Sequence, residues 1–78
     1  MIQVLLFAGL KDKVGSSSLR IKEENITIEE LKRTHLGIYG VEELLQQSMV
    51  AVNEEYAEMD TILKTGDVVA FVPPVSGG

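Results

Sequence analysis

Apolar and polar residues alternate at the start of the chain with the period of two that a half-buried β-strand requires. The alternation produces two faces, with Ile2, Val4, Leu6 and Ala8 on one and Gln3, Leu5 and Phe7 on the other. Because glutamine is mostly found at the surface, we expect the face that carries Gln3 to point outward. Phe7 is then at least partly exposed, and the opposite face belongs to the core.

The same criteria predict further strands separated by turns. Leu10 and Val14, four residues apart, fit a helical turn directly after the first strand. The later predicted strands are at 19–22, 49–52 and 68–72, with a return segment from Tyr56. The predicted turns are at 15–18, 53–55 and 64–67. The strand at 19–22 is expected to form a hairpin with the first strand.

The last predicted strand, residues 68–72, consists of apolar residues without interruption. Such a run is typical of a strand covered on both faces, so we expect the first and last strands to lie in the centre of one sheet. If Phe71 faces the helix that covers this sheet, Val72 lies on the outer face together with Phe7.

The strongest helix start in the sequence is at Thr27. Thr27 and Glu30 have the spacing of a capping box, in which each side chain accepts a hydrogen bond from the backbone of the other residue. Gly37 and Gly40 are expected to end this helix within about three turns. The apolar residues of 41–45 predict a second, shorter helical piece.

This order of elements predicts an α+β fold of the β-grasp, or ubiquitin-like, type. We expect a mixed sheet of four to five strands with one main helix packed on one face. Residues 1–72 are predicted to form the β-grasp domain, and residues 73–78 an extended C-terminal Gly-Gly tail.

Composition removes several classes of function. The 78 residues carry a net charge of −5, which makes a nucleic-acid backbone an unfavourable partner and a basic protein surface a better one. The absence of cysteine excludes thiol chemistry and thiolate metal sites, and no metal site is expected. No apolar run approaches the roughly 20 residues that span a bilayer. We therefore expect a cytoplasmic protein that binds neither membrane nor nucleic acid.

Few side chains suggest chemistry of their own. We interpret the single histidine, His35, as a partly buried helix residue without a carboxylate nearby. The acidic pairs are adjacent in sequence and are interpreted as solvated surface, so they predict no pair of catalytic carboxylates. Met49 and Met59 are interpreted as core or rim residues.

The end of the sequence combines features that suit a carrier of an acyl group. Pro73 and Pro74 cannot donate sheet hydrogen bonds, so they end strand pairing and favour an extended course. At roughly 3 Å per residue, the six residues from Pro73 to Gly78 reach on the order of 18 Å from the sheet. The α-carboxylate of Gly78 is ionised at neutral pH and needs activation, most directly by ATP as an acyl-adenylate. Glycine lets the tail pass through a narrow channel.

These residues resemble a known family. The ending Gly66-Asp67-Val68-Val69-Ala70-Phe71-Val72-Pro73-Pro74-Val75-Ser76-Gly77-Gly78 is similar to that of the molybdopterin synthase small subunits, a family of ubiquitin-like sulfur carriers. Residues 4–8 and 51–55 resemble the same family, and residues 15–48 match it in pattern alone.

The resemblance implies a mechanism and a set of partners. Gly78 would be adenylated by an ATP-dependent activating enzyme, converted to a thiocarboxylate, and would donate sulfur to cyclic pyranopterin monophosphate to form the molybdopterin dithiolene. The carrier would bind no cofactor of its own. It would act as the sulfur-donating subunit of a sulfurtransferase, paired in a heterotetramer with a large subunit that supplies the acid–base and substrate-binding groups.

The resemblance also implies roles for residues of this chain. The tail residues inserted into a partner would be Pro73, Pro74, Val75, Ser76 and Gly77. The apolar contact surface would comprise Phe7, Tyr56 and Val72, with Tyr56 standing where the family has a leucine-like residue.

Two other hypotheses remain at the level of sequence. One is a sulfur carrier for thiamine or another thiolated product, from which the Pro-Pro-Val-Ser segment separates this chain by resemblance only. The other is a ubiquitin-like modifier or binding module that transfers no sulfur.

Overall fold

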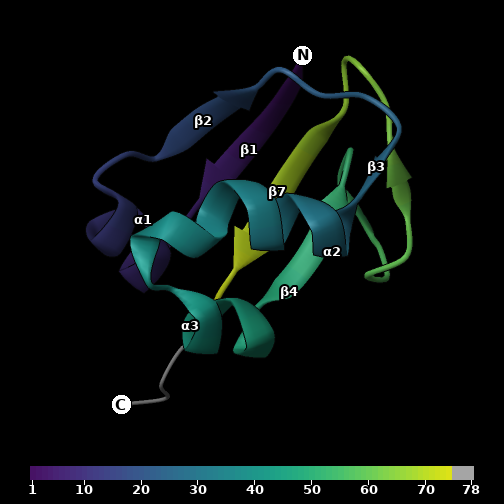
Figure 1. Cartoon of the computed structure of the whole chain (residues 1–78). Helices are drawn as coiled ribbons and strands as arrows, with labels where there is room; N and C mark the ends of the chain where they lie inside the picture. Colours follow the sequence, from purple (N-terminus) through teal and green to yellow (C-terminus); the bar gives the residue numbers. More distant parts are fainter. Residues whose placement is uncertain (75–78) are drawn as a thin grey trace.

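The computed structural model describes residues 1–74. Its main feature is a mixed five-stranded sheet with helices across one of its faces (Figure 1). The sheet has the order β2-β1-β7-β4-β5. Its strands are β1 (Ile2–Leu6), β2 (Ser18–Ile21), β4 (Met49–Val52), β5 (Glu55–Tyr56) and β7 (Val68–Val72). β1 and β7 pair in parallel, and the other pairs are antiparallel. The predicted β-grasp fold is confirmed, with the last strand in the sheet centre and the first beside it.

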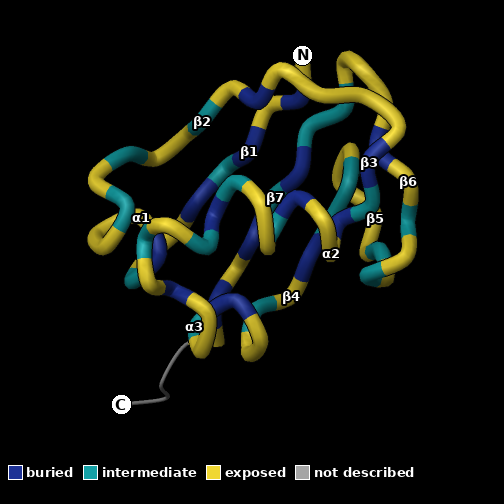
Figure 2. Tube along the Cα trace, viewed as in Figure 1, coloured by how far each residue is buried: buried dark blue, intermediate teal, exposed yellow. Residues whose placement is uncertain are grey.

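The two faces of the sheet differ in burial as the alternation predicts. Ile2, Val4 and Leu6 are at most 2% exposed, and Phe71 of β7 is fully buried beneath the helices. Figure 2 shows dark blue, buried segments on the central strands and on the sides of the helices that face them. The core therefore lies between the sheet and the helical layer. The expectation for Ala8 was wrong: the strand ends at Leu6, and Ala8 is an exposed residue that begins the next helix.

The helical layer begins with α1 (Ala8–Val14), which follows β1 directly. One longer helical run then crosses the sheet and changes its winding twice, and a last helix follows it. These segments are α2 (Ile28–Leu31), the π-helical η1 (Lys32–Leu36), the 3₁₀ turn η2 (Gly37–Tyr39) and α3 (Glu42–Gln47). The predicted main helix and the shorter piece after it are both present.

The start and the end of this helical run can be compared with the prediction. The capping box is confirmed, because the Glu30 amide donates to Thr27 Oγ1 over 3.1 Å and the Thr27 amide to Glu30 Oε1 over 3.4 Å. Gly37 does not end the run, as its φ of −60° and ψ of −28° are helical. The left-handed Gly40, with a φ of 67°, ends it instead.

A second, two-stranded sheet was not predicted. It pairs β3 (Ile26–Thr27) with β6 (Ile62–Leu63) in antiparallel fashion. Two-residue strands carry too short a pattern to be recognised from sequence. The Ile28 amide adds a bond of 3.1 Å to the Thr61 carbonyl, so this small sheet fastens the start of α2 to the loop before β7.

Two other interpretations are corrected by the structure. His35 is not remote from carboxylates, since its Nε2 lies 2.9 Å from Glu23 Oε2 in the loop after β2. Met49 is not a core residue, because 54% of it is exposed on the outer face of the sheet, whereas Met59 is partly buried as expected. Within residues 1–74, no helix is long and apolar enough to cross a membrane.

Candidate functional site: the outer face of the sheet

The helix-free face of the sheet carries a row of exposed apolar side chains. The register pairs Leu6 with Phe71 and Met49 with Val72, which places Phe7, the extended residue directly after β1, next to Val72 of β7 and Met49 of β4. Their exposed fractions are 44%, 41% and 54%. The predicted outward placement of Phe7 and Val72 is confirmed. We call these three residues the apolar row.

Tyr56 belongs to the same face but lies farther from β7. Tyr56 lies on the edge strand β5, where it pairs with Ala51 of β4, and it is 79% exposed. The strand β4 separates it from Val72. The structure therefore brings Phe7 and Val72 together and places Tyr56 at the rim of the face that they share.

The chain leaves the sheet next to the apolar row. Val72 ends β7, Pro73 is buried, and Pro74 is exposed. Because β7 is flanked by β1 on one side and β4 on the other, the exit lies at the middle of the sheet end. The remaining predicted tail residues, Val75, Ser76, Gly77 and Gly78, lie outside the described residues.

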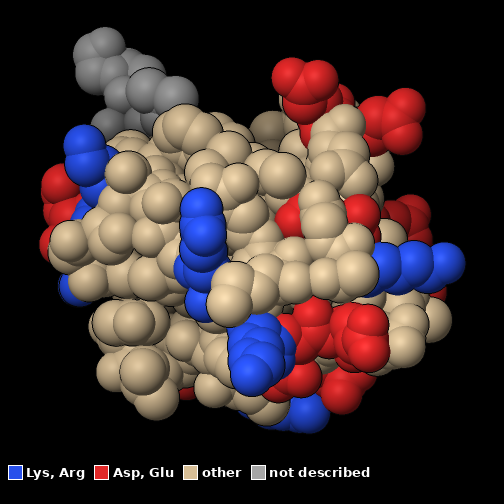
Figure 3. All heavy atoms as spheres, turned by 90° about the horizontal axis from the view of Figure 1, so that it is seen from above, with Lys and Arg blue, Asp and Glu red and all other residues tan. Residues whose placement is uncertain are grey.

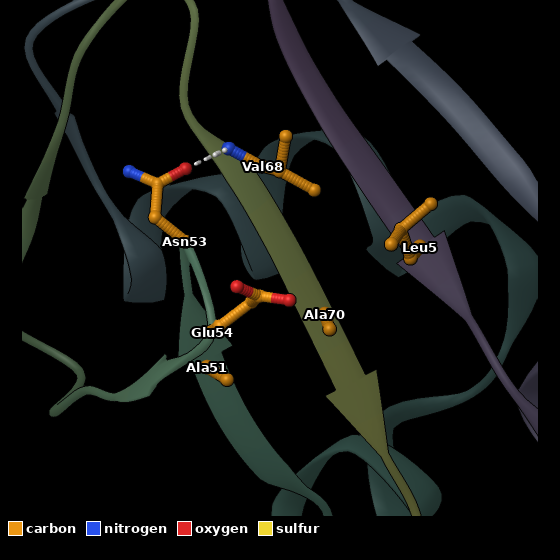
Figure 4. A pocket seen from close by; sticks show the side chains of 6 residues that line it. All are labelled: Leu5, Ala51, Asn53, Glu54, Val68 and Ala70. Atoms are coloured by element: carbon orange, nitrogen blue, oxygen red, sulfur yellow. Dashed lines mark hydrogen bonds between the residues drawn. The ribbon is translucent and has the colours of Figure 1, made fainter.

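A shallow hollow of about 400 Å³ occupies the same face, next to the apolar row along the strands. Figure 4 shows its floor on β1, β7 and β4 and its rim at the turn between β4 and β5. The lining residues are Leu5, Ala51, Asn53, Glu54, Val68 and Ala70. The sequence analysis did not predict this hollow. The small side chains Ala51 and Ala70, which pair across β4 and β7, were the signal that could have indicated it.

The rim of the hollow is held by a network around Asn53. Asn53 Oδ1 accepts a hydrogen bond of 3.0 Å from the Val68 amide, and its Nδ2 donates one of 3.0 Å to Asp67 Oδ1. Asp67 Oδ2 in turn accepts a bond of 2.8 Å from the Lys64 amide. These bonds connect the β4–β5 turn to the turn before β7. They fix the geometry of the rim at the start of the last strand.

The charged residues provide no catalytic cluster among residues 1–74. No group of three potential metal-ligating carboxylates and imidazoles occurs there, and no buried side-chain polar atom in this part lacks a hydrogen-bond partner. Figure 3 shows Lys and Arg interspersed with Asp and Glu, and a group of acidic side chains projects at the upper right of the view.

These features define a small β-grasp protein whose last, central strand ends beside an accessible apolar face. Residues 4–78 match the profile of the ThiS family. The molybdopterin synthase sulfur carrier subunit of Escherichia coli is 35% identical over 82 residues, which cover all of both chains. The chain belongs to the ThiS family of β-grasp proteins.

Solved structures agree with this assignment. The crystal structure of SAMP1 from Haloferax volcanii superposes with a TM-score of 0.85 at 26% identity, covering 99% of this chain and 98% of that one. A complex of subunits 1 and 2 of the molybdopterin-converting factor from Helicobacter pylori contains a chain with a TM-score of 0.72 and 29% identity. That match covers 99% of this chain and 97% of the other.

Proposed function

We propose that this chain is the sulfur carrier subunit of a molybdopterin synthase. The observation that carries the proposal is the end-to-end similarity to curated sulfur carrier subunits from bacteria and eukaryotes. The fold supports it, because the last strand is anchored in the sheet centre and leads directly to the Pro73-Pro74 segment.

The proposed chemistry takes place on the carboxylate of Gly78. An activating enzyme joins this carboxylate to the α-phosphate of ATP and expels pyrophosphate, which converts a poor electrophile into an acyl-adenylate. A sulfur donor then displaces AMP and leaves a thiocarboxylate. The thiocarboxylate gives its sulfur to cyclic pyranopterin monophosphate, and water restores the carboxylate. Two such cycles supply both sulfur atoms of the dithiolene.

The described residues contribute docking and direction to this cycle. Phe7 and Val72, with Tyr56 at the rim, offer apolar area that a partner can cover. Pro73 and Pro74 end the sheet and stiffen the exit of the tail. The partners that we propose are the large subunit of the synthase, in a heterotetramer, and the ATP-dependent activating enzyme. The catalytic acid–base groups belong to the large subunit.

The formation of the thiocarboxylate can be tested by intact-mass spectrometry of the protein purified from cells that contain the pathway. We expect a fraction in which one terminal oxygen is replaced by sulfur. A variant that lacks Gly78 is the control and should show no such fraction. If no thiocarboxylate forms even when the activating enzyme, ATP and a sulfur donor are supplied, the carrier proposal is wrong.

A second candidate function is that of a ubiquitin-like protein modifier. The close superposition on the archaeal modifier SAMP1 favours it, because the same fold and exit would serve isopeptide formation. Incubation of the thiocarboxylated protein with the large subunit and cyclic pyranopterin monophosphate separates the candidates. Molybdopterin formation supports the synthase role, whereas its absence would favour a modifier or a carrier for another thiolated product.

A further inference from the structure

We propose that the hollow on the outer face binds an arginine side chain of the synthase large subunit, with Glu54 as its anionic partner. The inference rests on the proposed function, because it assigns a contact to the complex in which that function is carried out. It concerns a different part of the face from the apolar row. It also identifies Glu54 as a specificity-determining residue that the sequence analysis did not single out.

The shape of the hollow suits a long, flat cation. Its floor is made by apolar side chains from β1, β4 and β7, and each of the four, Leu5, Ala51, Val68 and Ala70, is only partly buried. Figure 4 shows the Glu54 side chain extending from the turn over this floor toward Ala70. The aliphatic stem of an arginine can lie on the floor while its planar guanidinium reaches the carboxylate at the rim.

The polar groups around the hollow leave Glu54 as the acceptor for such a cation. The Asn53 side chain is already engaged through both of its polar atoms, by the Val68 amide and by Asp67. The ion pair identified among residues 1–74 involves Glu23 and His35, not Glu54. Because Glu54 is exposed and the chain carries a net charge of −5, a cationic partner group is favoured electrostatically.

The backbone at Glu54 provides a second observation that points to a role for its side chain. Asn53 and Glu54 have φ values of 51° and 72°, as the tight turn between β4 and β5 requires. Glycine is preferred at the second of these positions, whereas a residue with a Cβ is strained there. The strain persists at the position whose side chain lies over the hollow, which is where a functional group would be placed.

The test measures binding of the carrier to the large subunit from the same organism by isothermal titration calorimetry. Glu54→Gln removes the charge and keeps the size of the side chain. We expect its Kd to rise about 30-fold or more, since truncating one partner of a charge pair that is buried in an interface has a cost of that order. The increase should shrink at higher ionic strength, where the pair is screened in the unmodified complex. Glu24→Gln, exposed in the loop after β2, makes the same change in net charge and should leave the Kd unchanged.

A second variant separates binding from folding. Glu54→Gly relieves the left-handed strain, so we expect its Tm to rise while its affinity for the large subunit falls as in Glu54→Gln. Equal affinities of the unmodified chain, Glu54→Gln and Glu24→Gln would overturn the inference and leave the proposed function intact. Failure of the unmodified chain to bind the large subunit would overturn both.

Discussion

At the scale of single residues, alternation along the first strand separates the side chains that pack the core from those that are exposed on the outer face. Ile2, Val4 and Leu6 hold the sheet against the helices, while Phe7, one residue beyond the strand, remains 44% exposed. Removing apolar area from an exposed position leaves the core packing untouched. Phe7 can therefore be changed to test docking without testing folding.

Phe7→Asp is expected to weaken binding to the synthase large subunit at least 10-fold, because it places a charge in the apolar row. Calorimetry on the purified proteins measures this loss. The free energy of unfolding should change by about 0.5 kcal/mol or less, as is usual for exposed positions. Gln3→Asp, which lies on the same face outside the row, serves as the control. A Phe7→Asp chain that fails to fold would show that this side chain belongs to the core.

At the scale of elements, the long helical run is the part in which local sequence and observed structure differ most. The run passes through α, π and 3₁₀ winding between Ile28 and Tyr39. Two glycines lie near its end and have opposite backbone geometry. Gly37 is helical, and Gly40 is left-handed.

These glycines predict opposite effects of the same substitution. Gly37→Ala should raise the free energy of unfolding by about 0.5–1 kcal/mol, because alanine loses less backbone entropy in a helical conformation. The nearest atom to a Cβ added at Gly37 is the Lys32 carbonyl oxygen, 4.0 Å away, so no clash opposes the gain. Gly40→Ala should lower the free energy of unfolding by about 1 kcal/mol, because a Cβ is strained at a φ of 67°.

Urea denaturation of both variants measures the two changes. Two equal destabilisations would contradict the helical assignment of Gly37 and would restore the earlier helix end that the sequence suggested.

The sequence predicted the elements whose patterns are long or chemically marked. The strands β1 and β7, the capping box at Thr27 and the turn at Asn53 each carry such a signal. The small sheet of β3 and β6, the end of the helix and the contact between His35 and Glu23 were not predicted. Each of these depends on which segments tertiary packing brings together, and a single sequence does not contain that information. The hollow was missed for the same reason, since its lining comes from three strands.

At the scale of the whole molecule, the strand that leads to the tail is also the best supported strand. β7 pairs with β1 on one side and β4 on the other, and its buried residues contact the helical layer. By contrast, β5 is a two-residue edge strand with exposed side chains. The domain is thus most stable where its proposed working segment emerges.

This arrangement predicts a gradient of amide hydrogen exchange. The amides of Val69 and Phe71 should exchange only through global unfolding, because β7 is the central strand and neither of its neighbours is an edge strand. The amide of Tyr56, on the edge strand, should exchange many times faster. Hydrogen exchange followed by NMR measures the three rates. Similar protection of Val69 and Tyr56 would contradict the central role given to β7.

The parallel pairing of β1 and β7 also decides how the domain bears mechanical load. When a partner holds the segment after Pro74 while the domain is pulled away, the force runs along β7. Hydrogen bonds to β1 and β4 lie across that direction, so they resist in shear and must fail together rather than unzip one at a time. A domain built in this way resists unfolding when it is pulled by the end of its central strand.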